Sequence, residues 1–125
     1  MSAPRSHQIL AQFNQLIDEH LTDLINHRAT EMHEIEAFAE LMHIHPIHLS
    51  NTIKDVDGTS PCGIYQTKII ETAKLLLANQ TLSIRQIAFT LTFDPSQFTK
   101  WFKRFTGITP KQYRVSLTTK GKPNT

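Results

Sequence analysis

Residues 83–114 read SIRQIAFTLTFDPSQFTKWFKRFTGITPKQYR, which is the pattern of two helices joined by a tight turn. Ser83, followed three residues later by Gln86, forms a capping box and predicts a helix start. Asp94-Pro95 predicts a second start, because a cap residue before a first-turn proline favours helix initiation. Apolar residues at helical spacing form the inward faces, which are Ile84, Ile87, Ala88 and Leu91 in the first helix and Phe98, Phe102 and Phe105 in the second.

The same arrangement occurs 49 residues earlier in the chain, without a gap. Each unit reads as a helix, a tight turn, a second helix that begins at proline, a glycine stop and a further capped helix. This is the pattern of a helix-turn-helix unit, and here it is present twice. The positions that recur are Ile35, Ala39, Pro46, Leu49, Ile53, Lys54, Gly58, Ser60 and Pro61, which correspond to Ile84, Ala88, Pro95, Phe98, Phe102, Lys103, Gly107, Thr109 and Pro110.

The remaining segments are helical as well, and no stretch alternates with the period of a strand. The sequence therefore predicts an all-α fold of about seven helices, among them a first helix over 7–26 and a short last helix that begins at Thr109-Pro110. The predicted organisation is an N-terminal tail (1–8), a first helix with the first helix-turn-helix subdomain (9–60), a linker helix (61–79), the second subdomain (80–117) and a flexible tail (118–125).

The net charge of +2 over 125 residues conceals a strong asymmetry. Residues 1–60 hold three basic and nine acidic side chains, whereas residues 61–125 hold ten basic and two acidic ones. Such a basic half suggests a polyanionic partner. The single cysteine, Cys62, excludes an internal disulfide framework and a Cys-rich zinc site. Residues 1–8 lack the apolar stretch of a signal peptide and no apolar run approaches about 20 residues, so we expect a soluble, cytoplasmic protein without a membrane partner.

The second helix of each unit exposes polar side chains that can bind DNA. Asn and Gln can bond adenine edges, Lys can reach guanine or phosphate, and Ser and Thr can do either. The linker helix 61–79 spans roughly 28 Å, near the ~34 Å between major-groove faces on one side of B-DNA. One chain could therefore read an asymmetric site as a monomer. The outward residues are Ile47, His48, Ser50, Asn51 and Lys54 in the first unit, and Ser96, Gln97, Thr99, Lys100, Lys103 and Arg104 in the second.

From about Ile9 to Arg114 the chain resembles the DNA-binding domain of the AraC/XylS family of bacterial transcription regulators. The matching segments are FAELMHIHPIHLSNTIKDVDGTSP (38–61), AKLLL (73–77) and the quoted stretch 83–114. The resemblance implies two homeodomain-like helix-turn-helix subdomains joined by a long helix, a double-stranded DNA site of adjacent major-groove segments, and control of promoters through RNA polymerase. Many members also carry an effector-binding domain before this part, so the chain is either a small stand-alone regulator or a C-terminal fragment.

The resemblance also assigns roles to individual residues. It implies base-facing roles for Pro46, Ile47, Ser50, Asn51, Pro95, Ser96, Gln97 and Lys100. It implies mainly phosphate contacts for His48, Lys54, Thr99, Lys103 and Arg104. The chain departs from the family pattern in three ways: Thr92 replaces the usual glycine of the second turn, that turn is one residue shorter, and His45 replaces a Ser or Thr cap, which predicts weak capping of the first recognition helix.

Two alternatives remain beside DNA reading. The chain could be a helical protein-interaction module with only nonspecific DNA affinity, or a metal or pH sensor built on His43, His45 and His48. No cysteine or carboxylate completes a metal-ligand spacing, so we expect no metal and no cofactor, and we expect protonation of His45 or His48 to strengthen DNA contact. Trp101 is expected to pack at a subdomain edge, whereas for Lys111 and Arg114 phosphate contact and a solvated helix end are equally consistent. No catalytic motif is present, so the chain is not expected to be an enzyme.

Overall fold

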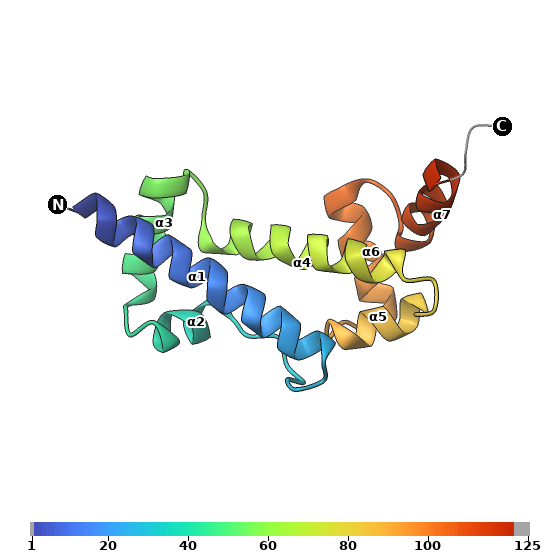
Figure 1. Cartoon of the computed structure of the whole chain (residues 1–125), viewed down its shortest axis with the longest axis horizontal. Helices are drawn as coiled ribbons and strands as arrows, with labels where there is room; N and C mark the ends of the chain where they lie inside the picture. The colour runs from blue at the N-terminus through green and yellow to red at the C-terminus, as the bar shows by residue number, and fades with distance from the viewer. Residues whose placement is uncertain (1, 122–125) are drawn as a thin grey trace. The chain divides into compact units, whose positions relative to one another are not determined.

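The computed structural model describes the backbone of residues 2–121 and the side chains of residues 5–118. This part of the chain consists of helices joined by turns and holds no strand, which confirms the all-α prediction (Figure 1). No helix among the described residues is long and apolar enough to cross a bilayer. The helices are α1 (Ser2–Ile25), α2 (Ile35–Leu41), α3 (Pro46–Asp57), α4 (Pro61–Ala78), α5 (Ile84–Thr90), α6 (Pro95–Thr106) and α7 (Pro110–Gly121).

The chain divides into two compact units, and the boundary between Ile69 and Ile70 lies inside α4. Unit 1 holds α1, α2, α3 and the first part of α4, and unit 2 holds the second part of α4 with α5, α6 and α7. The expected linker helix is therefore shared by two cores. Tyr65 and Ile69 are buried in unit 1, and Ala73 and Leu77 are buried in unit 2.

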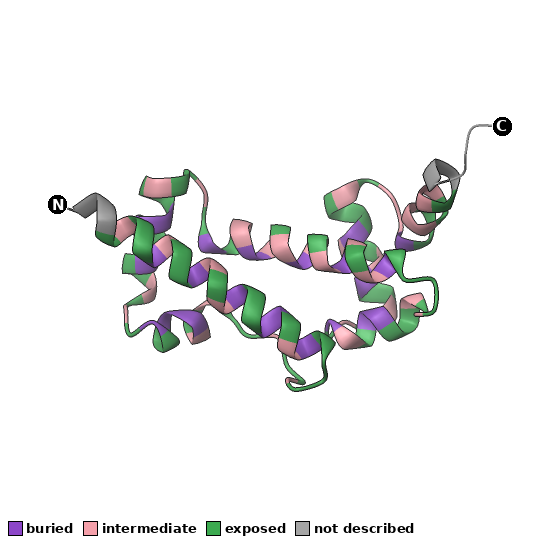
Figure 2. Cartoon of the chain, in the orientation of Figure 1, coloured by how far each residue is buried: buried purple, intermediate pink, exposed green. Residues whose placement is uncertain are grey.

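The core of unit 1 forms where the apolar stripe of α1 packs against α2 and α3. Figure 2 shows this stripe as one buried line along α1, with exposed residues on the opposite side. The ring of Phe38 contacts the rings of Phe13 and Tyr65 edge-on, at centroid distances of 5.8 and 5.1 Å. Such edge contacts between aromatic rings add to the stabilisation from burial.

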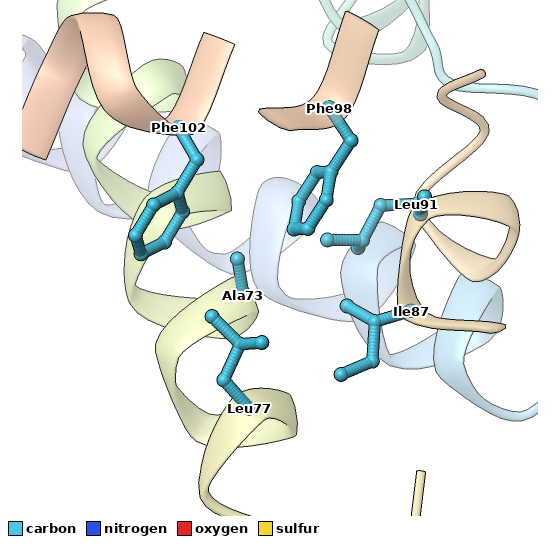
Figure 3. Packing of buried hydrophobic residues seen from close by; sticks show 7 residues of the cluster. Ala73, Leu77, Ile87, Leu91, Phe98 and Phe102 are labelled. Carbon is cyan, nitrogen blue, oxygen red and sulfur yellow. The ribbon is translucent and has the colours of Figure 1, made fainter. Parts of the chain in front are cut away.

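The core of unit 2 consists of side chains from α4, α5 and α6 that point toward a common centre (Figure 3). Phe98 and Phe102 of α6 are fully buried, as the sequence predicts, but Phe105 is 49% exposed. The prediction for Phe105 was wrong because this residue lies in the last turn of α6, where its ring is tilted against that of Trp101, with 5.9 Å between centroids, and lies outside the centre of the core. The buried members are Ala73, Leu77, Ile87, Ala88, Leu91, Phe98 and Phe102.

The predicted helix starts are confirmed by their hydrogen bonds. Gln86 N–H donates to Ser83 Oγ at 3.0 Å and Ser83 N–H donates to Gln86 Oε1 at 2.8 Å, which completes the capping box of α5. Thr109 and Gln112 form the same reciprocal pair before α7, at 3.1 and 2.8 Å. Each box satisfies backbone donors that the first turn of a helix leaves without a partner.

Gly58 and Gly107 end α3 and α6 in the left-handed conformation, with φ values of 76° and 87°. The helices α2 and α5 also end in a left-handed residue, but there it is His43 (φ 58°) and Thr92 (φ 67°). At both ends the two hydrogen bonds of a Schellman motif are present, for example Phe93 N–H to the carbonyl of Ala88 at 2.8 Å. The shortened second turn therefore has the conformation of the first.

The repeat is also a repeat of backbone hydrogen bonds. Leu49 N–H donates to the carbonyl of His45, and Gly58 N–H donates to the carbonyl of Lys54. The same two backbone bonds recur 49 residues later, from Phe98 and Gly107. The two helix-turn-helix units are therefore equivalent in structure without any insertion between corresponding elements.

Two predictions about the ends of the chain need correction. The helix α1 begins at Ser2, so residues 2–8 are helical and do not form a separate tail. The helix α7 continues to Gly121, so residues 118–121 extend it, and the rest of the predicted flexible tail (122–125) lies outside the described residues. The sequence prediction placed both ends where the apolar spacing stops, but a helix can continue through polar residues.

Candidate nucleic-acid interface

The first candidate surface is the outward side of α3, the second helix of the unit 1 repeat. Leu49, Thr52 and Ile53 are buried on the inward side of this helix. Ile47 is 65% exposed, although its side chain is large and apolar. Of the residues predicted to face DNA from this helix, Pro46 is half-buried and Ile47, His48, Ser50, Asn51 and Lys54 are exposed.

The second candidate surface is the outward side of α6, which occupies the equivalent place in unit 2. Phe98 and Phe102 anchor this helix in the core, so its opposite side faces away from the core. Of the residues predicted to face DNA here, Pro95 and Thr99 are half-buried and Ser96, Gln97, Lys100, Lys103 and Arg104 are exposed. The geometry thus leaves all the predicted contact residues of α3 and α6 at least partly accessible.

His45 caps α3 with its imidazole. Its Nδ1 accepts a hydrogen bond from Ile47 N–H at 3.1 Å, so the expected weak cap is in fact a side-chain cap. An imidazole nitrogen accepts only when it carries no proton. Protonation at this nitrogen would therefore remove the cap, and the expectation that protonated His45 strengthens DNA contact is opposed by this bond.

Asp94 caps α6 from the equivalent position. One carboxylate oxygen, Oδ2, accepts from Ser96 N–H at 3.1 Å and from Ser96 Oγ–H at 2.6 Å. These bonds, the one from the Ser96 hydroxyl foremost, hold the pKa of Asp94 below its ordinary value. The sequence predicted the cap, but it gave no indication that the hydroxyl of Ser96 would also be engaged.

The positive charge of the candidate interface is concentrated in unit 2. The helix α6 carries three exposed cations on its outward side, whereas Lys54 is the lysine of α3 and is followed by two exposed carboxylates. Attraction of phosphates is therefore stronger around α6 than around α3. The cations are Lys100, Lys103 and Arg104, and the carboxylates are Asp55 and Asp57.

Arg114 has a structural role that sequence reasoning left open. Its Nε donates to the carbonyl of Leu77 at 2.9 Å, and its Nη2 donates to the carbonyl of Asn79 at 3.2 Å. These carbonyls lie at the C-terminal end of α4, where a cation is favourable because the carbonyls have no partners within the helix. The guanidinium of Arg114 therefore binds the carbonyls at the end of α4 and is not a solvated group at a helix end.

Trp101 packs at the edge of the unit 2 core, as predicted. It is half-buried, and its ring lies 4.7 Å from the ring of Phe93 and 6.0 Å from that of Phe98, between centroids. A side chain held between aromatic neighbours stabilises the turn before α6.

The histidines of unit 1 form a different cluster from the predicted one. Among the residues that the structure describes, no three His, Cys, Asp or Glu side chains are placed to hold a metal ion. Instead, His20 is buried and its ring stacks on that of His33 at 3.9 Å. His20 Nε2 accepts from His33 N–H at 2.9 Å, and Tyr65 O–H donates to the carbonyl of His33 at 2.9 Å.

Burial lowers the pKa of His20 to about 4, with a smaller contribution from His33 beside it, and burial also raises the pKa of Tyr65. Neutral His20 is therefore the form that holds the segment between α1 and α2. The sequence does contain a signal for this residue, because position 20 continues the helical spacing of Phe13, Ile17 and Leu24.

Comparison with known proteins gives a consistent result. The model of the helix-turn-helix domain family matches residues 38–116. The chain is 33% identical over 84 residues to the HTH-type transcriptional regulator YobQ of Bacillus subtilis. The aligned residues cover 66% of this chain and 35% of YobQ. It is 28% identical over 95 residues to the bifunctional transcriptional activator/DNA repair enzyme AdaA of the same organism, covering 75% of this chain and 45% of AdaA. The chain thus spans less than half the length of either relative.

Solved structures agree with the fold. The C-terminal domain of AraT, a response regulator from Geobacillus stearothermophilus, superposes with a TM-score of 0.72 at 28% identity, covering 86% of this chain and 84% of that one. The C-terminal domain of the two-component response regulator yesN from Fusobacterium nucleatum gives 0.62 at 30% identity, covering 78% and 96%. With two helix-turn-helix units of matching geometry and a family model that covers most of both, the chain belongs to the helix-turn-helix family of AraC-type DNA-binding transcription regulators.

Proposed function

We propose that the chain binds a specific site on double-stranded DNA by placing α3 and α6 in two adjacent segments of the major groove. The repeated geometry of these helices carries the proposal. Both begin at a proline behind a side-chain cap, bury two residues that are four positions apart, and expose polar side chains at equivalent positions. In helix-turn-helix proteins the N-terminal residues of the second helix contact base edges.

The base-facing residues supply complementary chemistry for the four base pairs. Asn51 and Gln97 suit adenine, Lys100 suits the acceptors of guanine, and exposed Ile47 suits the methyl group of thymine. The proposed base-facing set is Pro46, Ile47, Ser50 and Asn51 on α3, and Pro95, Ser96, Gln97 and Lys100 on α6.

A second set of residues binds phosphates and fixes the position of each helix. These contacts provide affinity and salt dependence but little sequence information. The proposed set is His48, Lys54, Thr99, Lys103 and Arg104. Because His45 Nδ1 caps α3 by accepting from Ile47 N–H, His48 and not His45 is placed in this phosphate-binding set.

One copy of the chain suffices for an asymmetric site. The two units share α4, a helix of 18 residues, and each unit carries its own recognition helix. A monomer that carries two non-identical recognition helices selects two different half-sites and needs no palindrome.

The family and fold are those of transcription regulators and not of enzymes. We therefore propose that the chain acts in the bacterial cytoplasm, where promoter DNA is found, and controls promoters through RNA polymerase. The relatives are longer than this chain, which supports an effector domain as a further partner. The catalytic part of the name of AdaA describes that protein, and no catalytic step is assigned here.

In-vitro selection from a random DNA library tests the proposal. We expect enrichment of an asymmetric sequence with two half-motifs about one helical turn apart. Binding with a steep salt dependence but no enriched sequence would contradict it, and would favour a protein-interaction module that binds DNA only nonspecifically.

A further inference from the structure

At the start of α6 the carboxylate of Asp94 and the hydroxyl of Ser96 are hydrogen-bonded to each other. Ser96 Oγ lies 2.6 Å from Asp94 Oδ2, and the same oxygen accepts from the backbone N–H of Ser96 at 3.1 Å. Both residues are exposed on the side of the unit that carries the proposed base contacts. The hydroxyl is therefore available to DNA while it is bonded to Asp94.

The direction of this bond follows from the number of protons. An ionised carboxylate has no proton and can only accept, so the hydroxyl of Ser96 must be the donor. A serine hydroxyl has a single proton and two lone pairs. Once that proton points to Asp94, Ser96 can offer only lone pairs to a further partner.

A group that only accepts can discriminate between bases in the major groove. Adenine N6 and cytosine N4 are donors there, whereas guanine O6, thymine O4 and the N7 of both purines are acceptors. An acceptor-only hydroxyl placed at the exocyclic group of the base bonds adenine N6 or cytosine N4 and is repelled by guanine O6 or thymine O4. A freely rotating hydroxyl could bond either kind and would not discriminate.

We propose that Asp94 is a positioning residue that makes Ser96 an obligate acceptor, so that unit 2 selects adenine or cytosine on the strand that Ser96 contacts. This inference rests on the proposed base-facing role of Ser96. In terms of base pairs, the selected orientation is A·T or C·G over T·A or G·C at that position.

Unit 1 provides an internal contrast. The residue equivalent to Ser96 is Ile47, and the cap of its helix is an imidazole nitrogen of His45, which accepts from the backbone N–H of Ile47. Isoleucine offers no lone pair, and its exposed side chain fits the methyl group of thymine instead. The two equivalent positions thus read different chemistry, as an asymmetric site requires.

Two single variants and their combination test the inference. Ser96→Ala removes the hydroxyl, and Asp94→Gly removes the carboxylate while it keeps a residue type that is well accepted at the start of a helix. Selection from a random library with the full chain and each variant identifies the base pair whose preference Ser96→Ala erases. At that pair we expect the full chain to prefer A or C over T or G by about fivefold, the effect of one neutral hydrogen bond.

We expect Asp94→Gly to reduce the preference at this pair to within about twofold, because the released hydroxyl proton can then serve acceptor bases as well. The double variant should show no further change in preference. A purely structural role for Asp94 would lower affinity for all sequences equally and leave this preference intact, so that result overturns the inference.

Two more outcomes also overturn it. A preference for G or T at the pair that Ser96→Ala affects would mean that the hydroxyl donates. If Ser96→Ala erases no preference anywhere in the site, while Asp94→Gly erases a preference for A or C, then Asp94 reads the base itself. If the full chain selects no sequence at all, the proposed function fails together with this inference. If the full chain selects a site but its preference at the Ser96 pair does not depend on Asp94, only this inference fails.

Discussion

Replacing Thr92 by glycine should stabilise unit 2. Thr92 ends α5 in the left-handed conformation, with φ 67°, and its side chain is exposed. A residue other than glycine loses roughly 1–2 kcal/mol in this conformation, and a β-branched residue lies at the upper end of that range. Glycine removes this strain, but its greater freedom in the unfolded chain offsets about 0.5–1 kcal/mol of the gain.

The net expectation is a stabilisation by about 1 kcal/mol, since the exposed side chain contributes little burial that could be lost. In a thermal unfolding experiment this corresponds to an increase of the Tm by about 4 °C for a domain of this size. Urea unfolding should give the same free energy with an unchanged slope. Both measurements should follow a signal from unit 2, for which the fluorescence of Trp101 is suitable.

The repeat supplies the matched control for this experiment. His43 occupies the equivalent position in unit 1, with φ 58°, but histidine is not β-branched and is enriched in the left-handed region. The change His43→Gly should therefore stabilise less than Thr92→Gly. A loss of stability in Thr92→Gly, or a gain no larger than that of His43→Gly, would refute the reasoning.

Three further experiments test other parts of the structure. The folded pKa of His20, about 4, lies below its unfolded value of 6.5, so unfolding takes up a proton between these pH values. The free energy of unfolding should therefore fall by roughly 2–3 kcal/mol as the pH drops from 7 to 4. In urea titrations at several pH values, His20→Gln should lose most of this dependence, because glutamine can still accept from His33 N–H. Lys103→Ala should reduce the slope of log affinity against log salt by about one. Arg114→Ala should leave that slope unchanged and lower the free energy of unfolding by about 1–2 kcal/mol. A reduced slope in both variants would contradict the structural role of Arg114. Asn51→Ala should cost about 1–3 kcal/mol on the selected DNA site and little on random DNA, and equal losses on both would refute a base-reading role.

Much of the fold follows from local rules, because helix starts, stops and inward faces are encoded within a few residues of where they act. The capping box at Ser83 and the glycine at position 107 could be identified in this way. The predictions were incomplete where a side chain acts over a long sequence distance. Arg114 bonds carbonyls 35 and 37 residues away, which no local pattern reveals.

Periodicity also gave an incomplete account of burial. The spacing of Phe105 matches that of Phe98, but a helix can extend beyond the elements that cover it, and only the tertiary structure shows where the cover ends. His20 shows the opposite case, since its position fits the buried stripe of α1 although its side chain is polar. Its burial requires a hydrogen-bond partner, and that partner is the backbone of a turn whose path the sequence does not predict.

The charge asymmetry implies that the two units contribute different properties to DNA binding. Electrostatic attraction depends on the number of cations that displace counterions, and α6 presents three where α3 presents Lys54 beside two carboxylates. The base contacts proposed for α3 are instead uncharged, with Ile47, Ser50 and Asn51 exposed on its outward side. Uncharged contacts add little affinity for random DNA but discriminate between bases once the helix lies in the groove. Unit 2 would therefore provide most of the nonspecific affinity, and unit 1 would mainly increase the difference between the selected site and other sequences.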